Sequence, residues 1–402
     1  MARKFLTGFE TGDTAVFDST STTSPGSLSI TTAAKRSGSY GLQIDKASGS
    51  NGIAFVRNGV TSGARIWSIS GGTEKYARFY FKLQSGFSTA THAIIIAAIR
   101  NSSAGNIVYI RTLTQVNNEC QIQLWAGSGP TTFYTITDFT KWYRLEIGGV
   151  DGDPAGTVTA KIYDGDSTSE LGSGSKTPLV ATSNWAIFDT GMISLVAGSG
   201  TATWYYDDIA LNNNVGSDNN SWCGPGSIYQ TAIVTGAGTK ADFTPSAGSN
   251  YQNVDEWPPD DATTYNETPS GSPNQREDWH TLSNYSGPNT VQAVSVVIRW
   301  TNVALNAGAN HEWGLLDSGT LPTGTSINSL SAYSYQGMCH GVRPYDGTSA
   351  WTNAAFNACE VGYYRELNDG TSQRDISAII CEVEDDTVTA PPVLRRIFIA
   401  TT

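Results

Sequence analysis

Two acidic stretches of this sequence are candidates for acid–base chemistry on sugars, which most often uses carboxylates. One is the pair Asp207–Asp208, and the other is the acidic run Glu382–Asp386. A retaining glycosidase needs two carboxyl groups about 5 Å apart. Neighbouring residues of a strand point to opposite faces of its sheet, so Asp207 and Asp208 are expected on opposite faces, where they cannot serve one sugar ring. These acidic residues therefore predict no active site.

Histidine and cysteine show no catalytic or zinc-binding spacing. His311-Glu312 lacks the second histidine of an H-E-x-x-H motif. The five cysteines include no C-x-x-C pair, and we expect free, mostly buried thiols. No glycine-rich stretch follows a strand and opens a helix, so no phosphate-binding loop is indicated. We predict that the chain has no catalytic residues and is not an enzyme.

The composition is typical of a β-sandwich. Among 402 residues there are 42 glycines, 10% aromatic residues and only 15% charged residues, which fits polar turns between aromatic and β-branched strands. The net charge of −12 argues against nucleic-acid binding, which needs clustered lysine and arginine. No apolar run predicts a membrane helix or a secretory signal. We therefore expect synthesis and assembly in a reducing cytoplasm.

Most of the chain shows the period-two alternation of strands with one face on a core. The expected strands include Tyr76–Leu83, Ala93–Ile99, Asn106–Thr112, Cys120–Trp125, Trp142–Ile147, Thr157–Tyr163, Met192–Val196, Thr203–Leu211, Ala293–Thr301, Ile376–Glu384 and Leu394–Ile399. Helical spacing is confined to Ser349–Tyr363, where Thr352 is placed to cap one short helix.

An Asn-, Ser- and Gly-rich stretch, Asn212–Gly226, separates two groups of strands. It predicts an all-β protein of two β-sandwich domains. The first spans residues 1–214, a linker spans 215–226, and a second, smaller sandwich with the short helix spans 227–402.

The first group of strands resembles the jelly rolls of concanavalin-A-like and laminin-G-like lectins and of glucanases. The resemblance rests on four motifs in order: GFETGD at Gly8–Asp13, KRSGSYGLQI at Lys35–Ile44, FTKWYRLEI at Phe139–Ile147 and WYYDDIALNN at Trp204–Asn213. Together they cover about half of the chain. The glucanases of this fold carry catalytic carboxylates on an E-x-D-x-x-E strand, and this sequence has no such strand.

The jelly-roll resemblance implies a structural calcium, held by acidic residues of the first and last strands. Here the ligands would be Glu10, Asp207 and Asp208, with Asp13 as a further candidate, because calcium prefers six to eight oxygen ligands. In the alternative interpretation, one aspartate faces solvent and the other accepts a hydrogen bond from a turn amide. No other cofactor is expected.

Lectin-like sandwiches bind sugars on exposed aromatic faces. Trp125 and Trp204 are our candidates for such a site. Sandwich cores also bury tryptophan, and this is the alternative for both residues and for Trp185. Trp142, which lies in an alternating strand, is expected in the core.

The second group of strands resembles a module of tailed-phage virion proteins. The motifs are NVDEWPPDDATTYN at Asn253–Asn266, VQAVSVVIRW at Val291–Trp300 and YDGTSAWTNAAFNACEVGYY at Tyr345–Tyr364. The rigid segment Trp257-Pro258-Pro259 could dock one subunit on another, or fold over its own sandwich.

The resemblance implies a virion structural protein that decorates the capsid or tail of a bacteriophage and stabilises the particle or displays its lectin-like domain. It would be assembled in the host cytoplasm and lie on the virion surface. The expected partners are the major capsid or tail protein, further copies of the chain and host glycans, without nucleic acid or membrane. One alternative is an adhesin that binds host polysaccharide, and a second is a polysaccharide depolymerase.

Overall fold

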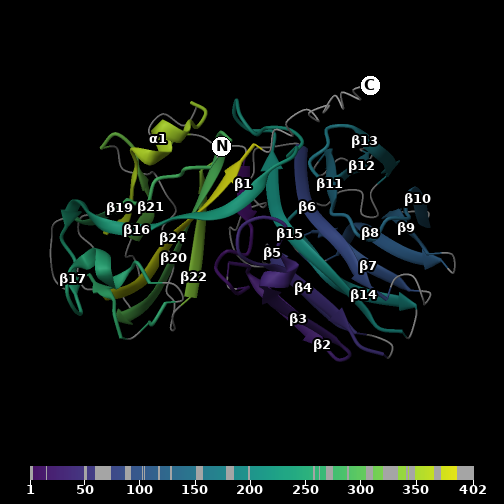
Figure 1. Cartoon of the computed structure of the whole chain (residues 1–402), viewed down its shortest axis with the longest axis horizontal. Coiled ribbons are helices and arrows are strands. Elements are labelled where there is room, and N and C mark those ends of the chain that lie inside the picture. Colours follow the sequence, from purple (N-terminus) through teal and green to yellow (C-terminus); the bar gives the residue numbers. More distant parts are fainter. Residues whose placement is uncertain are drawn as a thin grey trace, which may run out of the picture.

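The computed structural model confirms an all-β protein built from three antiparallel sheets (Figure 1). It describes residues 3–386 except 15, 49–51, 59–73, 87–91, 102, 104, 116–117, 127–128, 151–156, 178–184, 198–199, 257–258, 262, 269–274, 288, 305–310, 320–333, 341–342, 344–348 and 366–372. The expected strand Leu394–Ile399 lies outside the described residues. In the part of the chain that is described, no helix is long and apolar enough to cross a membrane.

Sheet A has eight strands in the order β13-β12-β11-β6-β15-β4-β3, and β1 also pairs with β15. Its strands are β1 Arg3–Thr7, β3 Gly26–Thr31, β4 Gly41–Lys46, β6 Glu74–Ser85, β11 Tyr143–Val150, β12 Val158–Asp164, β13 Glu170–Lys176 and β15 Ala202–Asn213. A short 3-10 helix, Thr32–Ala34, precedes β4, and Thr31 caps it.

Sheet B has seven strands in the order β10-β9-β8-β7-β14-β5-β2. Its strands are β2 Ser19–Thr23, β5 Ile53–Asn58, β7 Ala93–Arg100, β8 Asn106–Gln115, β9 Glu119–Ala126, β10 Gly129–Ile136 and β14 Ile187–Ala197. One core joins sheets A and B, because alternate residues of strands in both sheets point into it, such as Phe79 and Phe81 of β6 and Ile94 and Ile96 of β7. The two sheets form a jelly-roll sandwich.

Sheet C has nine strands on residues 227–385. They are β16 Ser227–Ala241, β17 Thr244–Pro245, β18 Asn266–Glu267, β19 Arg276–Leu282, β20 Val291–Ala304, β21 His311–Leu316, β22 Ser334–His340, β23 Glu360–Arg365 and β24 Gln373–Asp385. The long strand β16 pairs with β24 along its first half and with β19 along its second half. Sheet C therefore bends around β16, and one core lies between β20 and β24 on one side and β21 and β23 on the other.

The predicted helix is present but shorter than expected. Helix α1 spans Asn353–Asn357, and the Thr352 hydroxyl accepts a hydrogen bond from Ala355 N at 3.1 Å, as the sequence indicated. The expected continuation to Tyr363 is wrong, because Glu360–Arg365 pairs as β23 with β19 and β21. Alternation within β23 buries Val361 and Tyr363 in the core of sheet C.

The jelly roll and sheet C are in direct contact. Strand β1 pairs with β15 of sheet A and also contacts β20, β22 and β24 of sheet C, and Figure 1 shows it between the two groups of strands. The jelly roll ends at Asn213 and sheet C begins at Ser227. That residues 1–214 and 227–402 are separate domains, each able to fold independently, remains a prediction. The side chains of four cysteines are described and, as predicted, are free and buried: Cys120, Cys223, Cys359 and Cys381.

Candidate functional site

The outer face of sheet B is the face turned away from the core that it shares with sheet A. Val108 and Ile110 of β8 point into that core, so Tyr109 and Arg111 point outward. The same alternation directs further polar and aromatic side chains outward on four other strands. We call the whole set the arginine–aromatic face: Arg57 on β5, Arg100 on β7, Tyr109 and Arg111 on β8, Gln123 and Trp125 on β9, and Asp189 on β14.

Strand register places several of these residues in one row across the sheet. Asp189 pairs with Arg57 of β5 on one side and with Ala98 of β7 on the other. Ala98 pairs with Tyr109, and Tyr109 pairs with Trp125. Adjacent strands lie about 4.8 Å apart, so this five-strand row spans about 19 Å. The row is long enough to contact several units of an extended polymer.

An ion triplet occupies one end of the row. The Arg57 guanidinium donates to both carboxylate oxygens of Asp189, from Nε at 2.7 Å and from Nη2 at 2.8 Å. Arg100 Nε lies 2.8 Å from Asp189 Oδ2. Asp189 is fully buried, whereas both arginines remain partly exposed. Two guanidinium groups share one carboxylate, so the triplet carries a net charge of +1.

A second group of side chains occupies the other end. Arg111 Nε donates to Gln123 Oε1 at 2.7 Å, and its guanidinium carbon lies 4.9 Å from the centroid of the Trp125 ring. The Tyr109 ring meets Trp125 edge-on at 6.0 Å. Tyr109, Arg111 and Trp125 are each half-buried. Gln123 itself is buried, so this end offers aromatic surface and a cation side by side.

Trp125 was predicted as a sugar-binding residue, and the structure places it on this face. The other members of the face were not predicted. Alternation in the expected strand Asn106–Thr112 could have found Tyr109 and Arg111, because both lie between core residues. Arg57 and Asp189 carry no such signal, since the order of strands in the sheet brings them to the row.

Trp204 was also predicted to bind sugar, and this prediction is wrong. Its side chain is fully buried in the jelly-roll core, and its Nε1 donates to the Tyr206 hydroxyl at 2.9 Å. Trp204 and Tyr206 share the inward face of β15, so Tyr205 is the aromatic residue that points outward. Trp142, expected in the core, is half-buried and packs against Tyr205 at 6.5 Å. Trp185 is buried.

We predict that Trp204→Phe destabilises the protein without changing its contacts with ligands. The substitution removes the hydrogen bond to Tyr206 and leaves a small void in the core, which should lower the free energy of unfolding by about 1 to 3 kcal/mol. Chemical denaturation measures this change. If the folded variant bound polysaccharide more weakly than the unmodified protein, Trp204 would contact the ligand after all.

Asp207 and Asp208 were expected on opposite faces of the sheet, and this expectation is wrong. The register of β15 against β6 shifts between Asp207 and Ala210, and Asp208 has a positive φ of 50°. This β-bulge turns both carboxylates toward one segment. Asp207 Oδ2 accepts from the backbone nitrogens of Arg36 and Ser37, and Asp208 accepts from Arg36 Nε and the Ser37 hydroxyl. Burial, and then the neighbouring Asp208 charge, raises the pKa of Asp207 well above its usual range.

The carboxylates proposed for calcium bind protein donors. Both oxygens of Glu10 accept from Ser39 N at 2.9 Å, and Asp208 Oδ1 accepts from Ile228 N at 2.7 Å. Among the described residues, no group of three or more His, Cys, Asp or Glu side chains is placed to hold a metal ion. A structural calcium at Glu10, Asp207 and Asp208 therefore remains a prediction, and the described residues form no such group of ligands.

The acidic run of β24 lies at the junction between the jelly roll and sheet C. Glu382 Oε1 accepts from the Thr7 hydroxyl at 3.0 Å and from the backbone nitrogens of Gly8 and Glu10. Glu384 is paired with Arg3 at 3.0 Å and with Arg78 at 2.7 Å. All these groups are buried. The run therefore joins the two parts of the chain and presents no acid–base pair to solvent.

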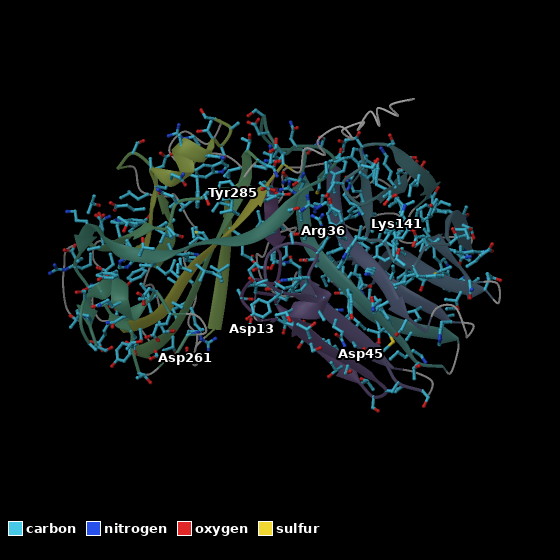
Figure 2. The ribbon with its side chains drawn as sticks, in the orientation of Figure 1. Asp13, Arg36, Asp45, Lys141, Asp261 and Tyr285 are labelled. Carbon is cyan, nitrogen blue, oxygen red and sulfur yellow. The ribbon has the colours of Figure 1, made fainter. Side chains whose placement is uncertain are left out.

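Arg36 makes a second connection across the same junction (Figure 2). Its Nη2 donates to Gly226 O at 2.7 Å and to the Ser227 hydroxyl at 2.8 Å. Its Nη1 lies 3.0 Å from Asp166 Oδ1. Buried charged side chains at this contact thus have partners from the opposite part of the chain or from their own, and the apolar cluster of Leu6, Ile228 and Ala293 lies across it as well.

The proposed docking segment is only partly described. Trp257 and Pro258 lie outside the described residues, and Pro259 is half-buried. A role of this segment in subunit contacts stays a prediction.

Comparisons with known proteins concern the fold. No family model matches the sequence, and a search of curated proteins finds no relative. An endo-β-1,4-glucuronan lyase from Trichoderma reesei is 15% identical with a TM-score of 0.37, over 52% of this chain and 95% of the lyase. A family 7 alginate lyase is 12% identical with a TM-score of 0.30, over 44% and 80%. The CBM22-1 xylan-binding domain of Paenibacillus barcinonensis Xyn10C is 12% identical with a TM-score of 0.28, over 52% and 94%.

These similar structures are jelly rolls of carbohydrate-active or carbohydrate-binding proteins. They correct one expectation drawn from the sequence. The expectation that the chain is not an enzyme is wrong because it excluded enzymes altogether, whereas polysaccharide lyases are among the chains of similar structure.

Proposed function

We propose that the chain binds polysaccharide across the arginine–aromatic face of sheet B. The observation that supports this most directly is the register-aligned row from Arg57 to Trp125, in which charged and aromatic side chains point away from the core. Side chains of this kind on one flat sheet face suit an extended ligand that crosses several strands.

The chemistry of the row fits sugar rings. The CH groups of a pyranose are weakly positive and pack against the electron-rich faces of indole and phenol rings, here Trp125 and Tyr109. Sugar hydroxyl groups accept hydrogen bonds from guanidinium groups, and the arginines of this face are partly exposed. Polar groups of this type orient a ligand while the aromatic rings supply contact area.

We expect Trp125→Ala to weaken polysaccharide binding by roughly tenfold or more, because a large aromatic ring that packs against a sugar ring contributes a large share of the affinity. Affinity electrophoresis against a panel of soluble plant, algal and bacterial polysaccharides identifies a ligand, and titration calorimetry then measures the affinity of both proteins.

Trp222→Ala is the matched control. Trp222 is also half-buried and also carries a cation over its ring, Lys161 at 4.2 Å, but it packs against Tyr76 of sheet A. We expect Trp222→Ala to bind as the unmodified protein does. Equal losses in the two variants, or no ligand in the panel, would contradict the proposal.

The same polysaccharides also test for cleavage. Each is incubated with the protein, and shortened chains or new end groups are measured. Cleavage that disappears in Trp125→Ala and persists in Trp222→Ala would place the reaction on the arginine–aromatic face.

Placement on a bacteriophage particle is a separate proposal, supported by the sequence motifs between Asn253 and Tyr364. In it, the chain is a virion protein in contact with a capsid or tail protein and with copies of itself, and the arginine–aromatic face recognises host glycans. Cryo-EM of particles from the producing phage tests this. Many symmetry-related copies would support decoration, a few copies at a fibre would support an adhesin, and absence from the particle would contradict the proposal.

A further inference from the structure

The arginine–aromatic face is positive although the protein is acidic. It contains three arginines and one carboxylate, Asp189, which gives it a net charge of +2, whereas the whole chain carries −12. Positive charge clustered on one face attracts ligands of negative charge to that face. The charge therefore bears on the class of ligand.

Half of this excess lies at Arg111, and the other half belongs to the triplet of Arg57, Arg100 and Asp189. In the described part of the chain, Arg57 and Arg100 pair with Asp189, and no ion pair joins Arg111 to a carboxylate. Hydrogen bonding to Asp189 raises the pKa of Arg57, whereas burial lowers the pKa of Arg111. Both guanidinium groups stay charged at neutral pH.

The next acidic residue along β9 is too far away to compensate Arg111. Glu119 pairs with Gln115 at the start of the strand, and Gln123 pairs with Arg111. Gln123 is four positions beyond Glu119, which is about 13 Å along a strand. The Arg111 guanidinium is directed toward Gln123 and Trp125 and forms no ion pair with Glu119.

We propose that the ligand of this face is an anionic polysaccharide with carboxylate-bearing (uronate) sugar units, and that Arg111 binds one of its carboxylates. This inference rests on the proposed function. The guanidinium is planar and donates from several nitrogens, which matches the geometry of a carboxylate. Nε and Nη2 of Arg111 both donate to Gln123 Oε1, so the carboxylate would bind at the Nη1 side of the guanidinium.

The neighbours of Arg111 hold it in place for this role. Gln123 fixes its Nε, and Trp125 lies under its guanidinium. A purely structural role, in which Arg111 only covers Trp125, would affect stability and leave any preference for charged ligands unchanged. The preference for charge is therefore the readout that separates the two roles.

The probes are alginate, polygalacturonate and polyglucuronate, each compared with its own carboxyl-reduced, neutral form. Titration calorimetry measures the affinity of each pair at low and at high salt. We expect at least one uronate polymer to bind roughly tenfold or more tightly than its neutral form. The preference should shrink as salt screens the charges.

Two substitutions assign this preference to Arg111. Arg111→Met removes the charge and should reduce the preference to near onefold, whereas Arg111→Lys should retain part of it. Lys161→Met is the matched control, because Lys161 is also a cation over an indole ring but lies on sheet A. It should keep the full preference. Circular dichroism confirms that each variant is folded.

The outcomes separate the inference from the proposed function. If the charged and neutral forms bind equally well, and Trp125→Ala weakens the binding of both, the inference is overturned and the proposed function stays in place. Failure of every polymer to bind overturns both. A charge preference that Arg111→Met and Lys161→Met reduce equally overturns the assignment to Arg111. Tighter binding of dextran sulfate than of every uronate overturns the choice of carboxylate.

Discussion

Glu384→Gln should lower the free energy of unfolding by about 3 to 5 kcal/mol, the range observed when one partner of a buried ion pair is removed. Glu384 pairs with Arg3 of β1 and Arg78 of β6, and the three side chains are at most 1% exposed. Glutamine keeps the shape of glutamate but not its charge, so two buried guanidinium groups would lose their counter-ion. Calorimetry and chemical denaturation at neutral pH measure the loss.

An exposed ion pair of similar length provides the control. Lys141 Nζ lies 2.6 Å from Asp164 Oδ2, and both side chains are more than 40% exposed, on the part of the jelly roll away from sheet C (Figure 2). Asp164→Asn should change stability far less, because water already solvates both groups. A Glu384 variant as stable as the Asp164 variant would show that the junction does not depend on this triplet. Two separate unfolding transitions in Glu384→Gln would support the domain boundary predicted at 215–226.

Local patterns were sufficient to predict the class of fold. Alternation of buried and exposed residues depends only on the geometry of a strand, so Asn106–Thr112 and Cys120–Trp125 were recognised as the strands that became β8 and β9. The same patterns could not tell which face of β15 is buried. Trp204, Tyr205 and Tyr206 put aromatic rings on both faces, and only packing against the core strands decides between them.

The candidate site was less predictable because it depends on strand order. Trp125 was identified by its residue type, but Arg57 and Asp189 reach the same row only because β5 and β14 are neighbours in sheet B. The β-bulge at Asp208 carries no sequence signal, since a non-glycine residue with positive φ is uncommon. Glu382 and Glu384 are two residues apart and share one face of β24, as their spacing implies. The partners of Glu384, Arg3 and Arg78, lie more than 300 residues away in the sequence.

The stability of the protein should also depend on pH through Glu382. Burial, and then the nearby Glu10 carboxylate, raise the pKa of this carboxyl to about 8, against the hydrogen bonds from Glu10 N, Thr7 and Gly8. The usual pKa of glutamate is near 4.3, so the folded protein holds a proton that the unfolded chain has already released. The stabilisation is complete below the unfolded pKa and is lost as pH rises toward 8.

Glu382→Gln isolates this effect, because the amide oxygen can accept the same hydrogen bonds and cannot ionise. Relative to the unmodified protein, the variant should gain about 3 to 5 kcal/mol of stability between about pH 5 and about pH 9. Denaturation curves of both proteins across this range give the difference directly. Asp138→Asn is the control: hydrogen bonds from Thr140 lower the pKa of Asp138, so its titration falls below this range. The stability of the Glu382 variant and of the unmodified protein could instead change in parallel up to pH 9. In that case Glu382 would be ionised in the folded protein throughout this range. The junction would then hold a buried charge that only the hydrogen bonds from Thr7, Gly8 and Glu10 N stabilise.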